Sequence, residues 1–327
     1  MLIVSQQDVE RTFTMPVAIE AMRDVLIALD RGEALQPLRS SVDLPGDRGK
    51  CWLMPAYAGA PASLGVKVLT AFPGNAGTPH ATHQGAVLLF GEHGELLALI
   101  DATSITAIRT AAVSAVATDV LARPDAARLA ILGSGAQAAS HLVAMSCVRK
   151  LSRVTLWSRN ADNAERFVRF ARDELHVDVY QCDTVADAVL DADIICTTTA
   201  ADTPILEAEL VRPGAHINAV GSGSATAREL SGSLVKNASV YVDRMESALS
   251  EAGEIVLAIA DGVITTEDVA GEVGAVLTGR LPGRRATTEI TLFKSVGLGA
   301  EDVASARAIY SACLKCGAGT RVNPGSS

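Results

Sequence analysis

The sequence lacks the features that mark several classes of protein. No stretch of eighteen apolar residues is free of charged residues or helix breakers, so we expect no membrane span and no membrane partner. The first residues contain no basic segment followed by a long apolar stretch, so no secretory signal is expected. The formal net charge of −9 disfavours a nucleic-acid-binding protein, because such a protein presents a basic face.

Cysteine is scarce and scattered. Of the six cysteines only Cys313 and Cys316, in CLKC, are spaced like a redox pair or half of a metal site. No second CxxC or CxxH pair completes a zinc site, so we expect no metal and interpret the two thiols as part of a terminal helix. This cysteine usage favours a reducing, cytoplasmic compartment.

The residues before position 126 form short apolar runs separated by turn residues. LRSSVDLP, CWLMPAYAG and LGVKVLTAFPG are bounded by Gly and Pro, as is typical of strands. Two apolar runs around Glu92-His93-Gly94 predict a hairpin, and residues 15–32 and 106–121 have the apolar spacing of helices. We therefore expect an α+β region with an antiparallel or mixed sheet.

After residue 126 apolar runs alternate with helical patterns. ARLAILGSG, RVTLWSR, VDVYQC, DIICTTT, HINAVGSG and ASVYVDR predict strands, and the segments between the earlier ones predict helices. Strands that alternate with helices form a parallel, doubly wound sheet, and continuous apolar runs are expected when helices cover both of its faces.

The stretch ILGSGAQA ends the first of these strands and opens a helix. Gly133 permits the tight turn, Gly135 lets a pyrophosphate approach the backbone, and Ala138 lets the helix lie close to the strand. The first helical residues, Ala136 and Gln137, then direct free N–H groups at the phosphates. We predict a dinucleotide site here, because the motif ends a strand, opens a helix and begins a run of alternating elements. The alternative is a plain tight turn between strand and helix.

The next strand indicates which dinucleotide binds. A carboxylate at its end would bind the ribose 2′-hydroxyl, but the sequence has Ser158, Arg159 and Asn160 there. Arg159 is suited to a 2′-phosphate, so NADP(H) is favoured and NAD(H) remains possible. If the cofactor is NADH, Arg159 is simply a solvent-facing side chain.

Two later strand ends are candidates for further cofactor contacts. Thr197, Thr198 and Thr199 end one strand at the carboxyl edge of the sheet, where ligands bind. Strand propensity alone explains at least one of these threonines. Val220 and Ser222 end the strand HINAVGSG, which we expect to lie near the nicotinamide.

Three cations stand among apolar residues in the first third of the chain. Arg39, Lys67 and Arg109 need partners, because an unpaired buried charge is costly. The partner is either a structural carboxylate, or solvent, or the carboxylate of a substrate. Met54 and His83 either shape the same pocket or have ordinary structural roles.

Several of these pieces resemble the ornithine cyclodeaminase/μ-crystallin family, in the same order and over nearly the whole chain. The matching segments are PLR at 37–39, MPAY at 54–57, GVKV at 65–68, THQG at 82–85, ITAIRTAAVSAVA at 105–117, LAILGSGAQA at 129–138, INAVG followed by REL at 228–230, and ITLFKSVG at 290–297.

The resemblance implies an α/β fold with two domains. A Rossmann-type doubly wound parallel sheet is expected at 119–298. A smaller α+β domain for substrate binding and dimerisation is expected at 1–118, completed by a C-terminal helix at 299–327. The resemblance further implies a homodimer.

The resemblance also implies a chemistry, hydride transfer between a nicotinamide and a carbon–nitrogen double bond beside a carboxylate. In this reading Arg39, Lys67 and Arg109 surround the carboxylate of a small imino or amino acid, and Thr110 lies near the phosphates. Lys67 either donates the proton to the imine nitrogen or orders a water that does. A lysine between two arginines should have a lowered pKa, which suits acid–base work near neutral pH.

One departure from the family pattern selects among activities. Cyclodeaminases of the family carry an Asp after the INAVG strand, whereas this sequence has Gly221-Ser222-Gly223. We therefore expect reduction of a cyclic imino acid, 1-pyrroline-2-carboxylate or its six-membered homologue, to L-proline or L-pipecolate. The alternatives, in order, are an amino-acid dehydrogenase or open-chain imine reductase, an ornithine cyclodeaminase, and a non-enzymatic protein that binds NADPH or another ligand.

Overall fold

The structure is a computed structural model that describes residues 1–59, 62–75 and 77–323. The chain divides into two units, Met1–Arg109 with Gly297–Ser327, and Thr110–Val296. The boundaries expected from the sequence, after residues 118 and 298, lie close to these divisions. Helix α3 (Ala102–Leu121) is continuous through the first division, and its start differs from the expected one. It begins four residues before Thr106, because the Asp101 carboxylate accepts a hydrogen bond from the Ser104 amide at 2.8 Å.

The first unit contains a seven-stranded mixed sheet, as expected. Its strand order is β15-β1-β6-β5-β4-β3-β2, antiparallel from β2 to β6, with β1 parallel to β6. The strands are β1 (Leu2–Val4), β2 (Ser40–Asp43), β3 (Lys50–Ala58), β4 (Ser63–Ala71), β5 (His83–Phe90), β6 (Leu96–Asp101) and β15 (Thr320–Arg321). The predicted hairpin is confirmed between β5 and β6, where Gly94 has a φ of 81°.

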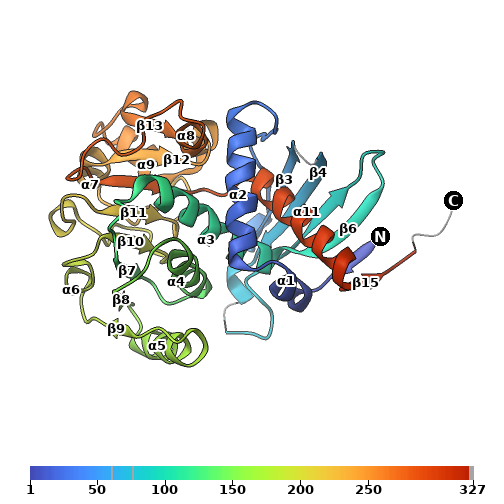
Figure 1. Ribbon diagram of the computed structural model, residues 1–327, viewed down its shortest axis with the longest axis horizontal. Coiled ribbons are helices and arrows are strands. Elements are labelled where there is room, and N and C mark those ends of the chain that lie inside the picture. Colours follow the sequence, from blue (N-terminus) through green and yellow to red (C-terminus); the bar gives the residue numbers. More distant parts are fainter. Residues whose placement is uncertain (60–61, 76, 324–327) are drawn as a thin grey trace. The chain divides into compact units, whose positions relative to one another are not determined.

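Helix α11 covers one face of this sheet and packs against α2 (Figure 1). The helical elements of the unit are α1 (Gln6–Thr12), α2 (Met15–Asp30), α11 (Gly299–Cys316), η1 (Pro45–Asp47) and η2 (Pro73–Asn75). The approach of α11 to the sheet depends on small residues. A Cβ on Gly65 would lie 2.8 Å from Val303, and one on Gly299 would lie 2.8 Å from the Met54 carbonyl oxygen.

The second unit contains the predicted doubly wound sheet. Eight strands lie in the order β13-β12-β14-β11-β10-β7-β8-β9, and every pair is parallel. The strands are β7 (Arg128–Leu132), β8 (Arg153–Trp157), β9 (Val179–Gln181), β10 (Ile194–Thr197), β11 (His216–Ala219), β12 (Ser239–Val242), β13 (Val269–Glu272) and β14 (Thr291–Lys294). The order reverses between β7 and β10, and in such sheets ligands bind at the carboxyl ends of the strands beside this point.

Helices connect these strands and bury their apolar residues (Figure 1). They are α4 (Ala136–Val148), α5 (Ala161–Leu175), α6 (Val185–Val189), α7 (Gly232–Asn237), α8 (Met245–Glu251), α9 (Gly253–Ala260) and α10 (Val273–Leu277), with η3 (Ala208–Leu210) and η4 (Thr266–Asp268). Strands β10, β11 and β14 are buried along their whole lengths, as expected for a sheet covered on both faces.

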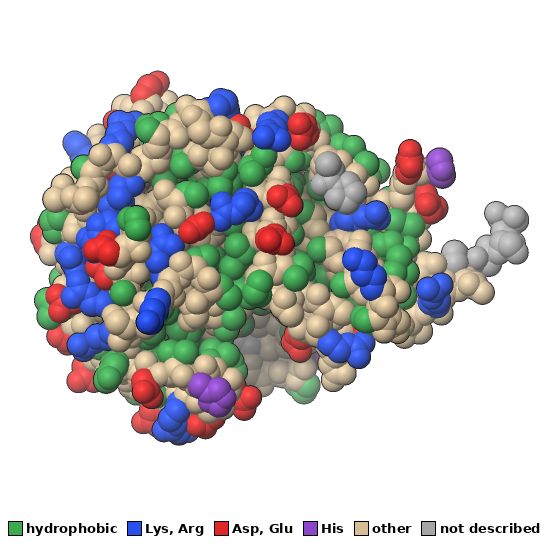
Figure 2. Space-filling view, viewed as in Figure 1, with side chains coloured by type: hydrophobic (Ala, Val, Ile, Leu, Met, Phe, Trp, Pro, Cys, Tyr) green, Lys and Arg blue, Asp and Glu red, His purple; other side chains and the backbone are tan. Residues whose placement is uncertain are grey.

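Two observations bear on membrane and nucleic-acid partners. Within the described part of the chain, α3 alone is long and apolar enough to cross a membrane, but 72% of its apolar window is buried, as in the core helix of a folded protein. On the face in Figure 2, Lys and Arg side chains are interspersed with Asp and Glu side chains.

Candidate active site

Lys67 lies in the first unit, on β4, with its side chain 1% exposed. Its Nζ donates hydrogen bonds to Thr106 Oγ1 at 2.7 Å and to Asp302 Oδ1 at 3.1 Å. Burial lowers the pKa of Lys67 to about 8, and the charges of Arg109 and Arg39 add to that effect, while Asp302 opposes it. The predicted lowering is therefore confirmed, but its largest cause is desolvation rather than the two arginines.

Arg109, on α3, is also buried and ion-paired. Its Nη1 donates to Glu301 Oε2 at 2.9 Å and its Nε donates to Asp302 Oδ1 at 3.0 Å. The guanidinium lies against Gly297, where a Cβ would come within 2.5 Å of Nη1. Gly297 also has a φ of 74°, so glycine is required here by both the backbone and the arginine.

Arg39 joins the same group from the segment before β2. Its Nη2 donates to the Gly297 carbonyl oxygen at 3.0 Å. The structure therefore brings the three predicted cations together within the first unit. We call Arg39, Lys67, Arg109, Glu301 and Asp302 the cation cluster. With Lys67 protonated these five groups carry a net charge of +1, which is suited to an anionic ligand.

Met54 and His83 lie on the same sheet face as Lys67. Met54 is paired with Lys67 across β3 and β4 and is buried. His83 begins β5, opposite Ala71, so the alternation of β4 places it on that face, four residues along from Lys67. It is exposed, and its Nδ1 lies 3.2 Å from Thr82 Oγ1. A substrate contact remains a prediction for both residues.

The glycine-rich loop of the second unit has the geometry that a dinucleotide requires. Gly133 has a φ of 117°, and a Cβ there would lie 2.7 Å from Thr198 Oγ1. Gly135 is the N-cap of α4 and has open space where a side chain would stand. Ala136 and Gln137 begin α4 with their amides at its N-terminus, and Ala138 is fully buried. These features fit a pyrophosphate group.

The three residues that follow β8, all predicted to contact the cofactor, differ in their hydrogen-bond partners. Ser158 Oγ lies 2.8 Å from Ser134 Oγ, so it helps to hold the glycine-rich loop. Asn160 Oδ1 accepts a hydrogen bond from the Asn163 amide at 2.9 Å, which caps α5, and its contact with the cofactor stays a prediction. Arg159 is exposed and makes no ion pair with the described residues.

Glu229 organises the loops that follow β10 and β11. It accepts hydrogen bonds from Thr197 Oγ1, Thr199 Oγ1 and the Thr199 amide at 2.7 Å each, and from the Gly221 amide at 2.8 Å. Burial raises the pKa of Glu229, and these donors oppose that effect. Thr197 is fully buried and its hydroxyl anchors the strand end to Glu229, so its contact with the cofactor stays a prediction. Thr198 Oγ1 donates to the Leu132 carbonyl oxygen at 3.1 Å.

A buried ion pair supports the same loops. Lys294 and Glu254 are both 0% exposed, 2.9 Å apart, and Lys294 Nζ also donates to the Ser222 carbonyl oxygen at 2.6 Å. The Glu229 amide donates to Glu254 Oε1 at 2.9 Å. The hydroxyl of Ser222 donates to the Ala227 carbonyl oxygen, and its contact with the cofactor stays a prediction.

The two glycines after β11 differ in their surroundings. A Cβ on Gly221 would lie 2.1 Å from the Thr199 carbonyl oxygen and 2.6 Å from Glu229 Oε1, whereas a Cβ on Gly223 would meet nothing within 4 Å. Gly221 therefore serves the close packing of the two loops. Roles of Val220, beside it, and of Thr110, buried on α3, in cofactor binding remain predictions.

Sequence reasoning missed the carboxylates and the second buried lysine. Lys294 stands alone in the apolar strand TLFK, which is the signal that identified Lys67. Glu301 and Asp302 lie in the first turn of α11, where carboxylates are common because they complement the helix dipole. Their position therefore did not mark them as partners of the cation cluster.

No group of three or more metal-ligating side chains occurs among residues 1–59, 62–75 and 77–323. Cys313 and Cys316 lie on α11 as predicted, the first buried and the second exposed, and both are free thiols.

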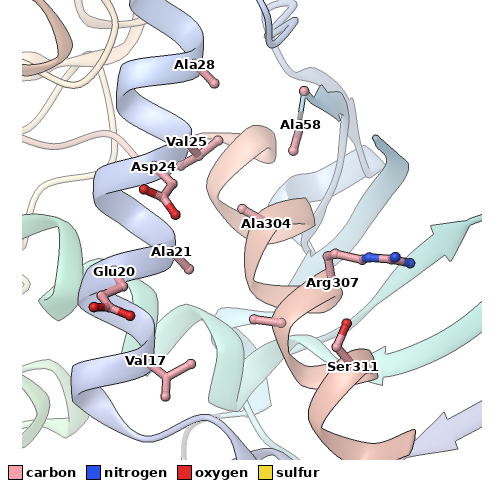
Figure 3. A pocket seen from close by; sticks show the side chains of 12 residues that line it. Val17, Glu20, Ala21, Asp24, Val25, Ala28, Ala58, Ala304, Arg307 and Ser311 are labelled. Carbon is pink, nitrogen blue, oxygen red and sulfur yellow. The ribbon is translucent and has the colours of Figure 1, made fainter. Parts of the chain in front are cut away.

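A cavity of about 310 Å³ lies in the first unit between α2 and α11 (Figure 3). Its lining is mostly Ala and Val, and none of the cation cluster lines it. In Figure 3 Arg307 extends away from α2, whereas Glu20 and Asp24 lie along α2. The charged side chains therefore do not converge on a common point.

The chain is similar to characterised imine reductases along its length. The sequence profile of the ornithine cyclodeaminase/mu-crystallin family matches residues 1–316. Ketimine reductase mu-crystallin of Mus musculus is 41% identical over 280 residues, 85% of each chain. The structure of Thermococcus litoralis Delta(1)-pyrroline-2-carboxylate reductase in complex with NADH and L-proline has a TM-score of 0.95 and 34% identity, with 98% of this chain and 100% of that chain covered. An archaeal alanine dehydrogenase dimer with bound NAD has a TM-score of 0.94 and 30% identity, with 99% of both chains covered. The chain therefore belongs to the ornithine cyclodeaminase/mu-crystallin family.

Proposed function

We propose that the protein is an NAD(P)H-dependent oxidoreductase that reduces a cyclic imino acid, 1-pyrroline-2-carboxylate or 1-piperideine-2-carboxylate, to the cyclic amino acid. The observation that carries the proposal is the buried Lys67 held beside Arg39 and Arg109. The relatives that act on cyclic imines support it. The Asp that assists deamination in cyclodeaminases is replaced by Gly223, which favours a substrate that arrives as an imine.

In the proposed mechanism the arginines hold the substrate carboxylate and fix its orientation. A nicotinamide cofactor held by Gly133, Gly135 and the N-terminus of α4 would supply the hydride for the imine carbon. Lys67 transfers one proton from its ammonium group to the imine nitrogen and becomes a neutral amine, which solvent protonates again. Its pKa of about 8 suits this role, because the ammonium form predominates at neutral pH and still gives up its proton readily.

For the cofactor we propose NADPH as the preferred form, with NADH also accepted. Arg159 is exposed at the end of β8, where an acid would repel a 2′-phosphate. Related structures contain NADH or NAD, so use of the non-phosphorylated cofactor is consistent with the family.

A substrate panel tests the function directly. Purified protein is mixed with NADPH or NADH and with cyclic and open-chain imino acids, and the nicotinamide absorbance is followed in both directions. We expect fast oxidation of the cofactor with the cyclic substrates. Activity confined to open-chain substrates would make the protein a dehydrogenase of the alanine type. Ammonia release from ornithine would make it a cyclodeaminase. Tight nucleotide binding without turnover would make it a binding protein.

We also propose that the protein is a homodimer located in the cytoplasm. The sheet face of the first unit opposite α11 is apolar and partly open. Its side chains include Ile3, Leu53, Leu64, Val66, Leu88 and Leu99. Ile3 and Leu53 are each 39% exposed and Leu64 is 50% exposed, and contiguous patches of this kind mark interfaces. A second copy of the chain is the expected occupant, because isologous dimers join identical surfaces.

A further inference from the structure

We propose that Asp302 is a positioning residue that aligns Lys67 and keeps it protonated for the reduction step. The inference rests on the proposed function, in which Lys67 is the proton donor. It adds a residue from the C-terminal helix that contacts Lys67 but need not contact the substrate.

The hydrogen bonds of Lys67 define its orientation. An ammonium group has three protons, and two of them are directed to Asp302 and Thr106 at 3.1 and 2.7 Å. The third is left for a ligand. Asp302 Oδ1 is shared with Arg109 Nε at 3.0 Å, so a single oxygen fixes both a carboxylate-binding arginine and the proton donor.

The position of Asp302 is itself fixed by the start of α11. The Ala300 amide donates to Gln36 Oε1 at 2.8 Å, and the Leu298 amide donates to Glu301 Oε2 at 3.2 Å. Gly299 lies so close to β3 that a Cβ would meet the Met54 carbonyl oxygen at 2.8 Å. This first turn therefore cannot shift without disturbing the sheet that carries Lys67.

The charges around Lys67 explain why Asp302 is required. Arg109 on α3 and Arg39 before β2 both favour the neutral amine, as does burial. Asp302 and Glu301 on α11 are the carboxylates of the cation cluster, and Asp302 is the one that contacts Lys67. The strand neighbours of Lys67 are Met54 on β3 and Val87 on β5, which carry no charge. Loss of the Asp302 charge therefore drives Lys67 towards the neutral amine.

The test compares Asp302→Asn with Glu301→Gln, because the two acids are adjacent and equally buried. We expect wild-type kcat for reduction to fall as pH rises past about 8, and the midpoint to move at least one pH unit lower in D302N. A midpoint lowered by one pH unit leaves about a third as much protonated Lys67 at pH 7.5, so kcat of D302N should fall at least about threefold there, with KM changed less. Oxidation of the amino acid needs the neutral form of Lys67 as the proton acceptor. The pH at which the oxidation rate rises should therefore also be lower in D302N. E301Q releases Arg109 from one partner and should raise KM without moving the midpoint.

A second measurement does not depend on turnover. Lysine labelled with ¹³C at Cε reports its own protonation by NMR, and Lys67→Met identifies the Lys67 signal. We expect a midpoint near 8 in the wild type and a lower one in D302N. Equal midpoints in both proteins would overturn the role of Asp302. A lower Lys67 midpoint in D302N than in the wild type, without activity on any imino acid, would refute the proposed function but not the role of Asp302. If D302N does not fold, as judged by circular dichroism, Asp302→Glu keeps the charge. The inference then requires an unmoved midpoint with a lower kcat, and a moved midpoint would overturn it.

Discussion

At the scale of single residues, the chemistry depends on a lysine that the fold removes from water. Lys67 is 1% exposed yet pairs with a carboxylate, so it can remain charged near neutral pH. Its low pKa and its place beside two arginines are unusual for a lysine whose role is purely structural. Perturbed ionisable groups of this kind concentrate at functional sites.

Replacing this lysine separates proton donation from binding. In Lys67→Met we expect kcat for imine reduction to fall about 10²- to 10⁴-fold, with a smaller change in KM, because methionine keeps the volume but has no proton to donate. Steady-state kinetics at pH 7 measure both parameters. Lys50→Met is the control, since Lys50 lies on β3 with a 39% exposed side chain paired to Asp43. A raised KM with unchanged kcat would contradict the assigned role.

Arg159 determines the preferred cofactor in our proposal. Arg159→Ala should lower kcat/KM for NADPH about tenfold or more, because one charge-assisted contact to the 2′-phosphate is lost, and should leave NADH nearly unaffected. Parallel assays with the two cofactors measure the ratio. Arg153→Ala is the matched control, as Arg153 begins the same strand and stacks on Tyr180 at 5.2 Å. A wild-type enzyme active with NADH alone would refute the interpretation of Arg159.

At the scale of elements, Glu229 joins the ends of two neighbouring strands. Its carboxylate receives four hydrogen bonds, from Thr197 at the end of β10 and from the segments after β10 and β11. Because parallel strands end at one edge of the sheet, this single residue sets the spacing of two loops at the edge where ligands bind. The sequence motif REL thus has a structural explanation.

The loop after β11 offers a matched pair of substitutions. Gly221→Ala places a methyl group 2.1 Å from the Thr199 carbonyl oxygen, while Gly223→Ala enters open space. We expect the first to lower the free energy of unfolding by about 1–3 kcal/mol or more, as overpacking does, and the second to change it little. Urea denaturation measures both. Equal stabilities would show that the loops separate more easily than their contacts suggest.

Elements were easier to predict from the sequence than their contacts. The helix at α2, the β5–β6 hairpin and the parallel sheet all follow from apolar periodicity, because burial is what that periodicity reflects. Strand β13 was missed because VAGE is short and contains Gly and Glu, which are uncommon in strands. The three cations were predicted, but their partners Glu301 and Asp302 were not. Pairing over about two hundred residues leaves no periodic signal in the sequence.

At the scale of the whole molecule, two buried histidines link stability to pH. Burial lowers the pKa of His141 to about 4 and that of His216 to about 3, against about 6.5 in an unfolded chain. The folded state therefore keeps both rings neutral while the unfolded state gains protons below pH 6.5. Stability is fully present above that pH and is lost as pH falls towards 4.

We expect the free energy of unfolding to decrease by up to about 1.4 kcal/mol per pH unit for each histidine below pH 6. Urea denaturation at several pH values measures the slope. His141→Gln should make the slope shallower, and His93→Gln, at an exposed position, should not. A slope that His141→Gln leaves unchanged would show that other groups dominate acid unfolding.

The proposed dimer has a direct test at its apolar sheet face. Leu64→Arg places a charge on the most exposed leucine of that face and should yield a monomer, because an unpaired charge is costly to bury. Size-exclusion chromatography with light scattering measures the mass. Leu190→Arg is the control, since Leu190 is 71% exposed in the other unit. A wild-type monomer, or a dimer that survives Leu64→Arg, would refute this interface.

The pairing of Lys67 with Asp302 joins residues 235 positions apart, and Arg109 with Glu301 joins residues 192 apart. All of Thr110–Val296 is synthesised between these partners. On the ribosome, the segments that carry the cations therefore emerge well before the carboxylates that pair with them. The first unit can be started early but completed only after the second has been made. Premature termination anywhere in the intervening segment would yield a chain whose nucleotide-binding unit is partly or wholly present and whose cation cluster cannot form.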